Sequence, residues 1–196
     1  MCIRDSINSE YWHNIVYPWD LIDGNRLALQ NLALFKSGKI ERNVVLKGPI
    51  SIGLGSVLCS GSYLEGPISI GDNCIIGPNS YIGNSVSIGD NTRIGAFSEI
   101  KDSIIMSDSV IGSYNSLVGT VVGNGTEFGT NVVANPSNRK VTYLDHTISL
   151  SERGAMVGNR CVIGNRAVLA GGSILLEGAT IGEGEVYNAD FQGDTI

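Results

Sequence analysis

The 196-residue sequence predicts an all-β fold, a rod in which very short strands coil around one apolar axis. Three observations predict it: an apolar residue at every sixth position, a glycine directly after many of them, and a small residue four positions after them. A period of six matches neither a helix nor an alternating strand, so each unit must be a short strand followed by a tight turn. Each unit then forms one side of a triangular coil, and successive coils pair as parallel strands.

The apolar series runs through ten consecutive units and predicts the inward-facing residues of the rod. After it, the register slips by one residue twice, first before Ile111 and again before Val122, and the pattern returns between Val157 and Ile181. The glycines that follow the apolar residues are expected to supply backbone conformations that other residues reach only with strain. The ten members of the series are Ile52, Leu58, Leu64, Ile70, Ile76, Ile82, Ile88, Ile94, Ile100 and Met106.

The small position of the repeat is expected to fill the remaining interior space. Cys74 and Cys161 occupy this position, so both are interpreted as packing residues. The four cysteines lie far apart without a CxxC pair, which argues against a zinc ribbon and gives no disulfide framework. No metal is predicted in this domain.

Composition limits the partners of the chain. It has a formal charge of -6 and only 13 lysines and arginines, too few for the broad positive surface that nucleic-acid binding needs. No apolar run reaches the roughly 20 residues of a spanning helix, and the N-terminus has no signal-peptide pattern. The sequence therefore predicts a cytoplasmic protein that binds neither nucleic acid nor membrane.

The N-terminal segment does not follow the period of six. Pro18 suits the first position of a helix, and apolar residues recur behind it at helical spacing, which predicts a short helix over 18–34 that packs across the first coil. Residues 1–6 match neither segment and are interpreted as a non-native leader. The expected organisation is a linker and helix over 7–43, the coiled rod over 44–188 and an acidic tail over 189–196.

The repeat is interrupted by about twenty mostly polar residues, an inserted loop over 135–154. Long loops in a compact domain are uncommon and often functional. Two interpretations stay open: a tolerated surface insertion, or a loop that reaches a neighbouring subunit and helps to close a site.

At this length the pattern [LIV]-G-x-x-[small]-x resembles the hexapeptide-repeat left-handed parallel β-helix. Two stretches carry a closer resemblance, HNIVYPWDLIDGN at 13–25 and SEIKDSIIM at 98–106. They are similar to segments of sugar-1-phosphate nucleotidyltransferases, especially the archaeal-type bifunctional uridyltransferase/glucosamine-1-phosphate acetyltransferases. The resemblance implies a C-terminal acyltransferase-type domain, a homotrimer, and nucleotidyltransferase chemistry that belongs to a separate N-terminal domain.

The acetyltransferase half of that family joins acetyl-CoA to an amino-sugar phosphate between adjacent rods of the trimer. The resemblance places Lys101 at the family's phosphate-contacting lysine and Asn135 in its CoA-side motif. The family's catalytic histidine falls on Ser113. A histidine suits the task of general base near neutral pH, so His146, beside Asp145 in the inserted loop, is the candidate substitute.

Other positions also depart from the family. Its arginine falls on Gly83, its substrate tyrosine on Ser116 and a further asparagine on Glu127. The basic residues around the insertion and the last coils lie where the family's CoA phosphates would lie, and the candidate CoA ligands among them are Arg153, Arg160 and Arg166.

Two functions therefore remain open from the sequence. The first is acetyl-CoA-dependent N-acetylation of an amino-sugar 1-phosphate, with sugar phosphate and CoA as ligands. The second is a catalytically decayed β-helix that trimerises or regulates an attached nucleotidyltransferase domain. A β-helix carbonic anhydrase is disfavoured because it needs three metal histidines per site, and this chain has two histidines.

Overall fold

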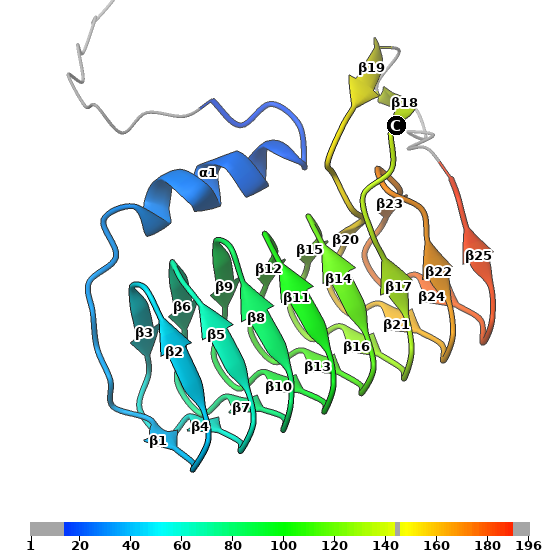
Figure 1. Cartoon of the computed structure of the whole chain (residues 1–196). Helices are drawn as coiled ribbons and strands as arrows, with labels where there is room; N and C mark the ends of the chain where they lie inside the picture. The colour runs from blue at the N-terminus through cyan, green and yellow to red at the C-terminus, as the bar shows by residue number, and fades with distance from the viewer. Residues whose placement is uncertain (1–13, 144–145, 190–196) are drawn as a thin grey trace, which may run out of the picture.

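The fold is a left-handed parallel β-helix of about eight turns with one short helix. The computed structural model describes residues 14–143 and 146–189. Three parallel sheets form the three sides of the coil, and each strand inside a sheet pairs with the strand one turn before it and the strand one turn after it (Figure 1). The coiled, all-β architecture predicted from the period of six residues is confirmed.

The chain visits the three sheets in a fixed order, which we name B, C and A. Sheet B consists of β1 (Lys39–Ile40), β4 (Val57–Leu58), β7 (Ile75–Ile76), β10 (Arg93–Ile94), β13 (Val110–Ile111), β16 (Glu127–Phe128), β21 (Val162–Ile163) and β24 (Thr180–Ile181). Sheet C consists of β2 (Val45–Lys47), β5 (Tyr63–Glu65), β8 (Tyr81–Gly83), β11 (Glu99–Lys101), β14 (Ser116–Val118), β17 (Val133–Ala134), β22 (Val168–Leu169) and β25 (Val186–Tyr187). Sheet A consists of β3 (Ile50–Ile52), β6 (Ile68–Ile70), β9 (Val86–Ile88), β12 (Ile104–Ile105), β15 (Val121–Val122), β20 (Met156–Val157) and β23 (Ile174–Leu175).

One continuous apolar stack fills the interior, as the repeat predicts. Ile82, Ile100 and Leu117 have no exposed surface, and they belong to one core that runs from Ile50 to Ile181. The small residues between them do more than fill space, because their side chains bond to the next coil. The Ser62 hydroxyl, for example, donates to the Gly77 carbonyl at 2.9 Å.

Cys74 and Cys161 lie in the same small position and are fully buried, which confirms them as packing residues. The Cys74 thiol donates to the Gly89 carbonyl at 3.1 Å, and the Cys161 thiol donates to the Leu176 carbonyl at the same distance. Burial raises the pKa of both thiols. A raised pKa keeps the reactive thiolate scarce at neutral pH.

The glycines that follow the inward residues have a different role from the one expected. A Cβ built on Gly95 would lie 2.5 Å from the backbone carbon of Gly112 in the next coil, and one on Gly53 would lie 2.4 Å from the Gly71 oxygen. Neither residue has a positive φ. These glycines are therefore required by the close approach of successive coils, while the left-handed turn conformation falls two residues later, as at Gly55.

The first register slip lies one unit earlier than the sequence pattern indicates. Ile105 is the inward residue, with 1% of its surface exposed, and Met106 points outward. The strand β12 pairs Ile104 with Ser87 and Ile105 with Ile88, so only five residues separate Ile100 from the next inward position. Met106 satisfies the apolar pattern because it contributes to a second apolar cluster outside the coil.

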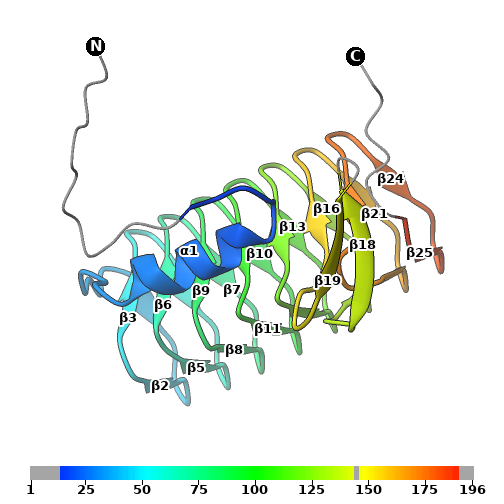
Figure 2. The same ribbon diagram turned by 90° about the horizontal axis from the view of Figure 1, so that it is seen from above.

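The helix α1 (Asp20–Leu29) is shorter than predicted and lies elsewhere. Trp19 is its N-cap, so Pro18 precedes the helix, and the helix stops at Leu29 although apolar residues continue to Leu34. It runs lengthwise along the outside of sheet A and does not cross the first coil (Figures 1 and 2). Arg26 holds it there by a bidentate ion pair with Asp102, and this interaction raises the pKa of the guanidinium.

The inserted segment is not an irregular loop. It forms an antiparallel hairpin of β18 (Arg139–Tyr143) and β19 (His146–Leu150), drawn in yellow-green beside α1 in Figure 2. Val141 and Leu150 pack with Trp19 and with the outward residues of sheet A in the second apolar cluster. The insertion therefore covers part of its own rod.

Two sequence expectations concern residues outside the described ranges: the leader over 1–6, and nearly all of the acidic tail over 189–196. Within the described residues, α1 falls short of the length and hydropathy that a bilayer-spanning helix requires.

Candidate functional site

The outer face of sheet C carries a network of aromatic and charged side chains. The first outward row brings Tyr63, Tyr81 and Glu99 into register along the rod, and the next outward row carries Glu65, Gly83 and Lys101. The rings of Tyr63 and Tyr81 stack with centroids 5.6 Å apart. The Lys101 ammonium lies 5.0 Å above the Tyr81 ring, a distance at which cation and ring attract.

Lys101 and Asn135, both predicted site residues, are joined by a chain of polar contacts across this face. The Lys101 ammonium lies 2.5 Å from one Glu99 oxygen, and the other Glu99 oxygen lies 3.3 Å from the Ser116 hydroxyl. The same hydroxyl lies 3.0 Å from the side-chain oxygen of Asn135.

Ser116 has a single proton and so can donate to only one of its two neighbours. Turning the Asn135 amide over would let its nitrogen donate to Ser116 while the hydroxyl donates to Glu99. The structure therefore unites Lys101, Asn135 and Ser116 in a network that can exchange hydrogen bonds with a polyhydroxylated ligand.

Gly83 is the residue on which the resemblance places the family's arginine, and in the structure the Tyr81 ring fills the space beside it. A Cβ on Gly83 would lie 2.6 Å from the Tyr81 hydroxyl, so the phenol lies across the glycine. That hydroxyl donates to Glu65 at 2.9 Å. Burial, and then the hydrogen bond to Glu65, raise the pKa of Tyr81, so the phenol stays protonated.

Ser113 lies at the corner between sheets B and C, at the opposite edge of sheet C from Lys101. Its carbonyl accepts a hydrogen bond from the Asn131 backbone at 2.9 Å. Next to it Tyr114 stacks on Phe97, with ring centroids 5.1 Å apart.

 The angle between the two ring planes is 7°. In a single chain, Ser113 is thus separated from the network around Lys101.

The three arginines predicted to bind CoA do not form one cluster. Arg153 is largely buried beneath α1, where it forms an ion pair with Asp23 at 2.6 Å. Arg160 is exposed at the corner between sheets A and B and pairs with Glu177. Arg166 is exposed at the corner between sheets B and C and pairs with Glu183.

His146 begins β19, where its backbone lies opposite Tyr143. Its side chain is not among those that the structure describes, and Asp145 lies outside the described residues. The expected pairing of these two side chains therefore stays a prediction.

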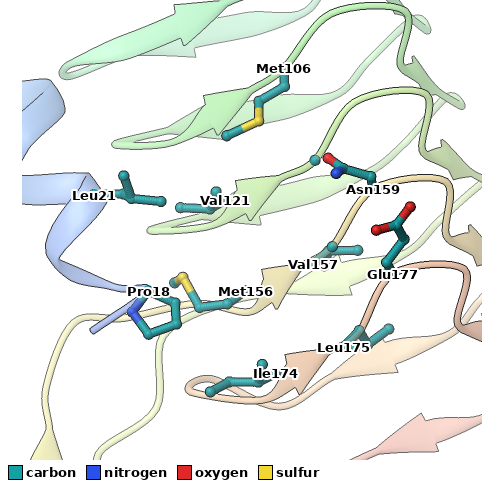
Figure 3. A pocket seen from close by; sticks show the side chains of 12 residues that line it. Pro18, Leu21, Met106, Val121, Met156, Val157, Asn159, Ile174, Leu175 and Glu177 are labelled. Carbon is teal, nitrogen blue, oxygen red and sulfur yellow. The ribbon is translucent and has the colours of Figure 1, made fainter. Parts of the chain in front are cut away.

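A pocket of about 280 Å³ lies at the edge of sheet A, between the start of α1 and the last coils (Figure 3). Its walls are apolar and include Leu21, Met106, Val121 and Met156. Asn159 and Glu177 contribute the polar part of its lining. Glu177 also forms an ion pair with Arg160, so the pocket lies next to the corner that carries this arginine.

The geometry can be compared with known proteins. The family model described as bacterial transferase hexapeptide (six repeats) matches residues 67–102, which include β8 and β11 of the network. The matched segment is thus similar to the hexapeptide repeat of bacterial transferases. The match ends one residue after Lys101, so the lysine and its Glu99 partner belong to the repeat itself.

Curated relatives match this chain over short segments. A bifunctional protein GlmU from Methanocaldococcus jannaschii is 38% identical over 47 residues, which are 24% of this chain and 12% of the relative. A bifunctional sugar-1-phosphate nucleotidylyltransferase/acetyltransferase from Sulfurisphaera tokodaii is 40% identical over 55 residues, or 28% of this chain and 14% of the relative. The matched segment thus spans only a small part of each curated relative.

Solved structures share the coiled architecture. The UDP-N-acetylglucosamine acyltransferase of Francisella novicida has a TM-score of 0.44 at 21% identity, over 72% of this chain and 60% of that chain. The acetyltransferase domain of PglB from Neisseria gonorrhoeae, solved in complex with acetyl coenzyme A, has a TM-score of 0.35 at 15% identity, over 78% of this chain and 54% of that chain.

Sequence reasoning missed the aromatic part of the site. Tyr63, Tyr81 and Glu99 are spaced by 18 residues, one full coil, and this spacing alone would have placed them in one outward row. The contact of Tyr81 with Glu65 had no such signal, because it depends on the direction in which the ring turns over Gly83.

Proposed function

We propose that the hexapeptide-repeat domain transfers the acetyl group of acetyl-CoA to the amino group of an amino-sugar 1-phosphate. The observation that carries the proposal is the network of Lys101, Glu99, Ser116 and Asn135 on sheet C, inside and next to the segment that matches the transferase repeat. The substrate class follows the similarity to the Sulfurisphaera tokodaii protein, a bifunctional sugar-1-phosphate nucleotidylyltransferase/acetyltransferase.

The reaction forms a bond between the amine nitrogen and the thioester carbonyl carbon and breaks the bond between that carbon and sulfur. The thiolate leaves as CoA, and the amine gives up a proton to a base. Negative charge develops on the carbonyl oxygen in between, so hydrogen-bond donors near that oxygen accelerate the step.

The chain's own residues account for binding better than for proton transfer. Lys101 supplies a cation for the sugar phosphate, and Tyr81 supplies a flat face on which the apolar side of a sugar ring can rest. Ser116 and Asn135 supply a hydroxyl and an amide for the sugar hydroxyls. Ser113 cannot act as an imidazole does, so His146 is our candidate for the base.

CoA is proposed to bind along the last coils, with Arg160 and Arg166 as the exposed cations for its phosphates. Arg153 suits this role less well, because its ion pair with Asp23 is largely buried under α1, whereas the ion pairs of Arg160 and Arg166 are exposed. We further propose that the domain acts as a homotrimer in the cytoplasm.

The test is release of CoA from acetyl-CoA in the presence of glucosamine 1-phosphate or galactosamine 1-phosphate, followed with a thiol reagent against a blank without sugar. Sugar-dependent release is expected. Lys101→Met should raise KM for the sugar phosphate about tenfold, which corresponds to the loss of one charge-assisted contact. Lys47→Met is the matched control, because Lys47 lies over Tyr63 as Lys101 lies over Tyr81 and is exposed on the same face.

The second candidate is a module that assembles or regulates an attached nucleotidyltransferase domain. The observation in its favour is that a serine stands at the family's histidine position and a glycine at its arginine position. This function would show assembly without sugar-dependent CoA release, and calorimetry would detect no binding of CoA. Activity that disappears in His146→Ala but not in His13→Ala would decide for the acetyltransferase.

A further inference from the structure

Charged side chains of alternating sign connect α1, which lies along sheet A (Figure 2), with the corner between sheets C and A. One oxygen of Asp23 accepts from Arg26 at 2.8 Å, and its other oxygen accepts from Arg153 at 2.6 Å. Arg26 in turn donates from two nitrogens to the two oxygens of Asp102, at 2.7 Å for Nε. The charges therefore follow one another in the order Arg153, Asp23, Arg26 and Asp102.

The backbone of the turn at Asp102 does not require a charged side chain. Asp102 has a φ of 48°, and the same corner in the coils before and after it is held by Asn84 and Gly119, with φ angles of 57° and 61°. Asparagine tolerates this left-handed region as aspartate does. What the carboxylate adds at this position is the bidentate contact with Arg26, formed with only 16% of the Asp102 side chain exposed.

The same turn carries the proposed phosphate ligand of the site. Lys101 ends β11 and directly precedes Asp102, whose backbone nitrogen donates to the Asn84 carbonyl at 2.8 Å. The Ser103 hydroxyl donates to the Lys101 carbonyl at 2.6 Å. The Asp102 side chain contacts α1, whereas the Lys101 ammonium lies beside Glu99 on sheet C, so one turn links the helix to the site.

The ion pair of Arg26 has two consequences for Lys101. The first is geometric: a turn that is held by its side chain as well as by its backbone presents Lys101 in one fixed direction. The second is electrostatic, because the Lys101 ammonium already shares its charge with Glu99 at 2.5 Å. A further uncompensated carboxylate at Asp102 would repel an approaching phosphate, and Arg26 neutralises it.

We propose that Arg26 is a positioning residue of the sugar-phosphate site and acts through Asp102 on Lys101. The inference rests on the proposed function for the ligand, the phosphate of an amino-sugar 1-phosphate. Arg26 fixes and neutralises the turn from which Lys101 binds that phosphate, and it does so from α1. The affinity of the site for phosphate therefore depends on a helix that lies on another face of the coil.

A double-mutant cycle on the CoA-release assay tests whether Arg26 acts through Lys101. Arg26→Met removes the guanidinium and retains most of the aliphatic stem. We expect the KM for glucosamine 1-phosphate to rise about fivefold, with kcat and the KM for acetyl-CoA unchanged. In a Lys101→Met background, the same substitution should change this KM by less than about twofold, because the residue on which Arg26 acts is gone. An equal rise in both backgrounds would overturn the inference.

The matched control loosens the same helix at a different contact. The Asn25 side chain donates to the Ser85 carbonyl at 2.9 Å and accepts from the Ser87 hydroxyl at 2.5 Å. Asn25→Ala removes both hydrogen bonds and leaves the ion pair of Arg26 with Asp102 in place, so KM should not change. A rise in KM equal to that of Arg26→Met would show that Arg26 only fastens the helix, and would overturn the inference.

A rescue variant tests the charge. Asp102→Asn in the Arg26→Met chain removes the uncompensated carboxylate, and Asn84 shows that this corner accommodates asparagine. Part of the lost affinity for glucosamine 1-phosphate should return, and no recovery would contradict the role of Arg26 in neutralising Asp102. In both variants α1 should keep its place, because Trp19 and Ile22 remain in the second apolar cluster, and circular dichroism verifies this.

Hydrogen exchange of the turn is measured without ligand and so separates this inference from the proposed function. In peptides that cover 99–104, amide exchange should be about fivefold faster in Arg26→Met than in the wild type and unchanged in Asn25→Ala. A chain that responds in this way but releases no CoA would refute only the proposed function. Unchanged exchange in Arg26→Met would overturn this inference, whether or not the chain releases CoA.

Discussion

Sheets A and B contribute the same kind of inward-facing apolar residues to the core, but their outward-facing residues differ in what packs against them. The outward row of sheet A changes from Ser51, Ser69 and Ser87 to Ile104, Val121, Met156 and Ile174. The serine half lies under the body of α1, where Asn25 binds Ser85 and Ser87, and the apolar half is sealed by Trp19 and the hairpin. The outward row of sheet B includes Val110 and Val162, which no part of the described chain covers.

The difference shows that the repeat determines which residues point into the coil. It does not determine what packs against the outward residues of each sheet. One face of this rod is covered by the chain's own helix and hairpin. The outer rows of the other two faces carry aromatic, apolar and charged residues, several of them exposed. The predictions below test this contrast.

The largest effect is expected from placing a lysine on each face. Val121→Lys puts an ammonium into the second apolar cluster, where Val121 is 6% exposed, and should lower the free energy of unfolding by about 3 kcal/mol. Val110→Lys, at a 42% exposed position, should change it by less than about 0.5 kcal/mol at the level of the monomer. Urea denaturation at several protein concentrations measures both. Equal losses in the two variants would contradict the contrast between the faces.

The two classes of glycine should respond differently to alanine. Gly95→Ala forces a methyl group against the backbone of the next coil and should cost about 2 kcal/mol of stability. Gly178→Ala meets open space but has a φ of 73°, so it should cost about 1 kcal/mol. Thermal unfolding of the pair distinguishes the roles, and a larger loss at Gly178 would show that turn strain outweighs the approach of the coils.

A smaller effect is expected at Tyr81, and it depends on pH. Because the pKa of this phenol is raised above its usual value of 10.0, its contribution to stability is complete below pH 10 and declines as pH rises through the raised pKa. Tyr81→Phe should cost about 1 kcal/mol at pH 8 through the lost hydrogen bond to Glu65. The difference from wild type should shrink above pH 10. A difference that is constant with pH would argue against the Glu65 contact.

The last prediction concerns the reactivity of two buried thiols and not the stability of the fold. Cys74 and Cys161 are fully buried with raised pKa values, so a thiol reagent at pH 8 should label neither in the folded protein. Both should react in denaturant. Mass spectrometry of labelled peptides measures this, and it also establishes the blank for the CoA-release assay. Rapid native labelling of either thiol would mean that the coil opens locally.

The coil could be predicted from the sequence because the position of a residue within its hexapeptide indicates whether its side chain is buried. An apolar residue at every sixth position can point inward only if the chain turns with that period, so Ile82 or Leu117 could be assigned without tertiary information. The prediction for Met106 was wrong because the repeat pattern carries no information about which elements pack against the outside of the coil. An outward methionine under a helix and an inward one look alike in the sequence.

The candidate site was predictable only in part. Lys101 and Asn135 could be named from the family resemblance, and the structure joins them through Glu99 and Ser116. The hairpin formed by the insertion and the ion pair of Arg153 with Asp23 could not be predicted from the sequence, because each depends on where α1 lies.

By itself, the sequence determined the period, the inward stack and the transferase-like repeat of this chain. Those features are local, since coils pair with the coil 17 or 18 residues away through the same backbone bonds, except across the inserted hairpin, where Val121 pairs with Met156. Only the tertiary structure decided which face the helix covers, that the insertion folds back as a hairpin, and that the rows of sheets B and C remain open. These outcomes depend on contacts between segments as far apart as Asp23 and Arg153, and no periodic pattern encodes such contacts.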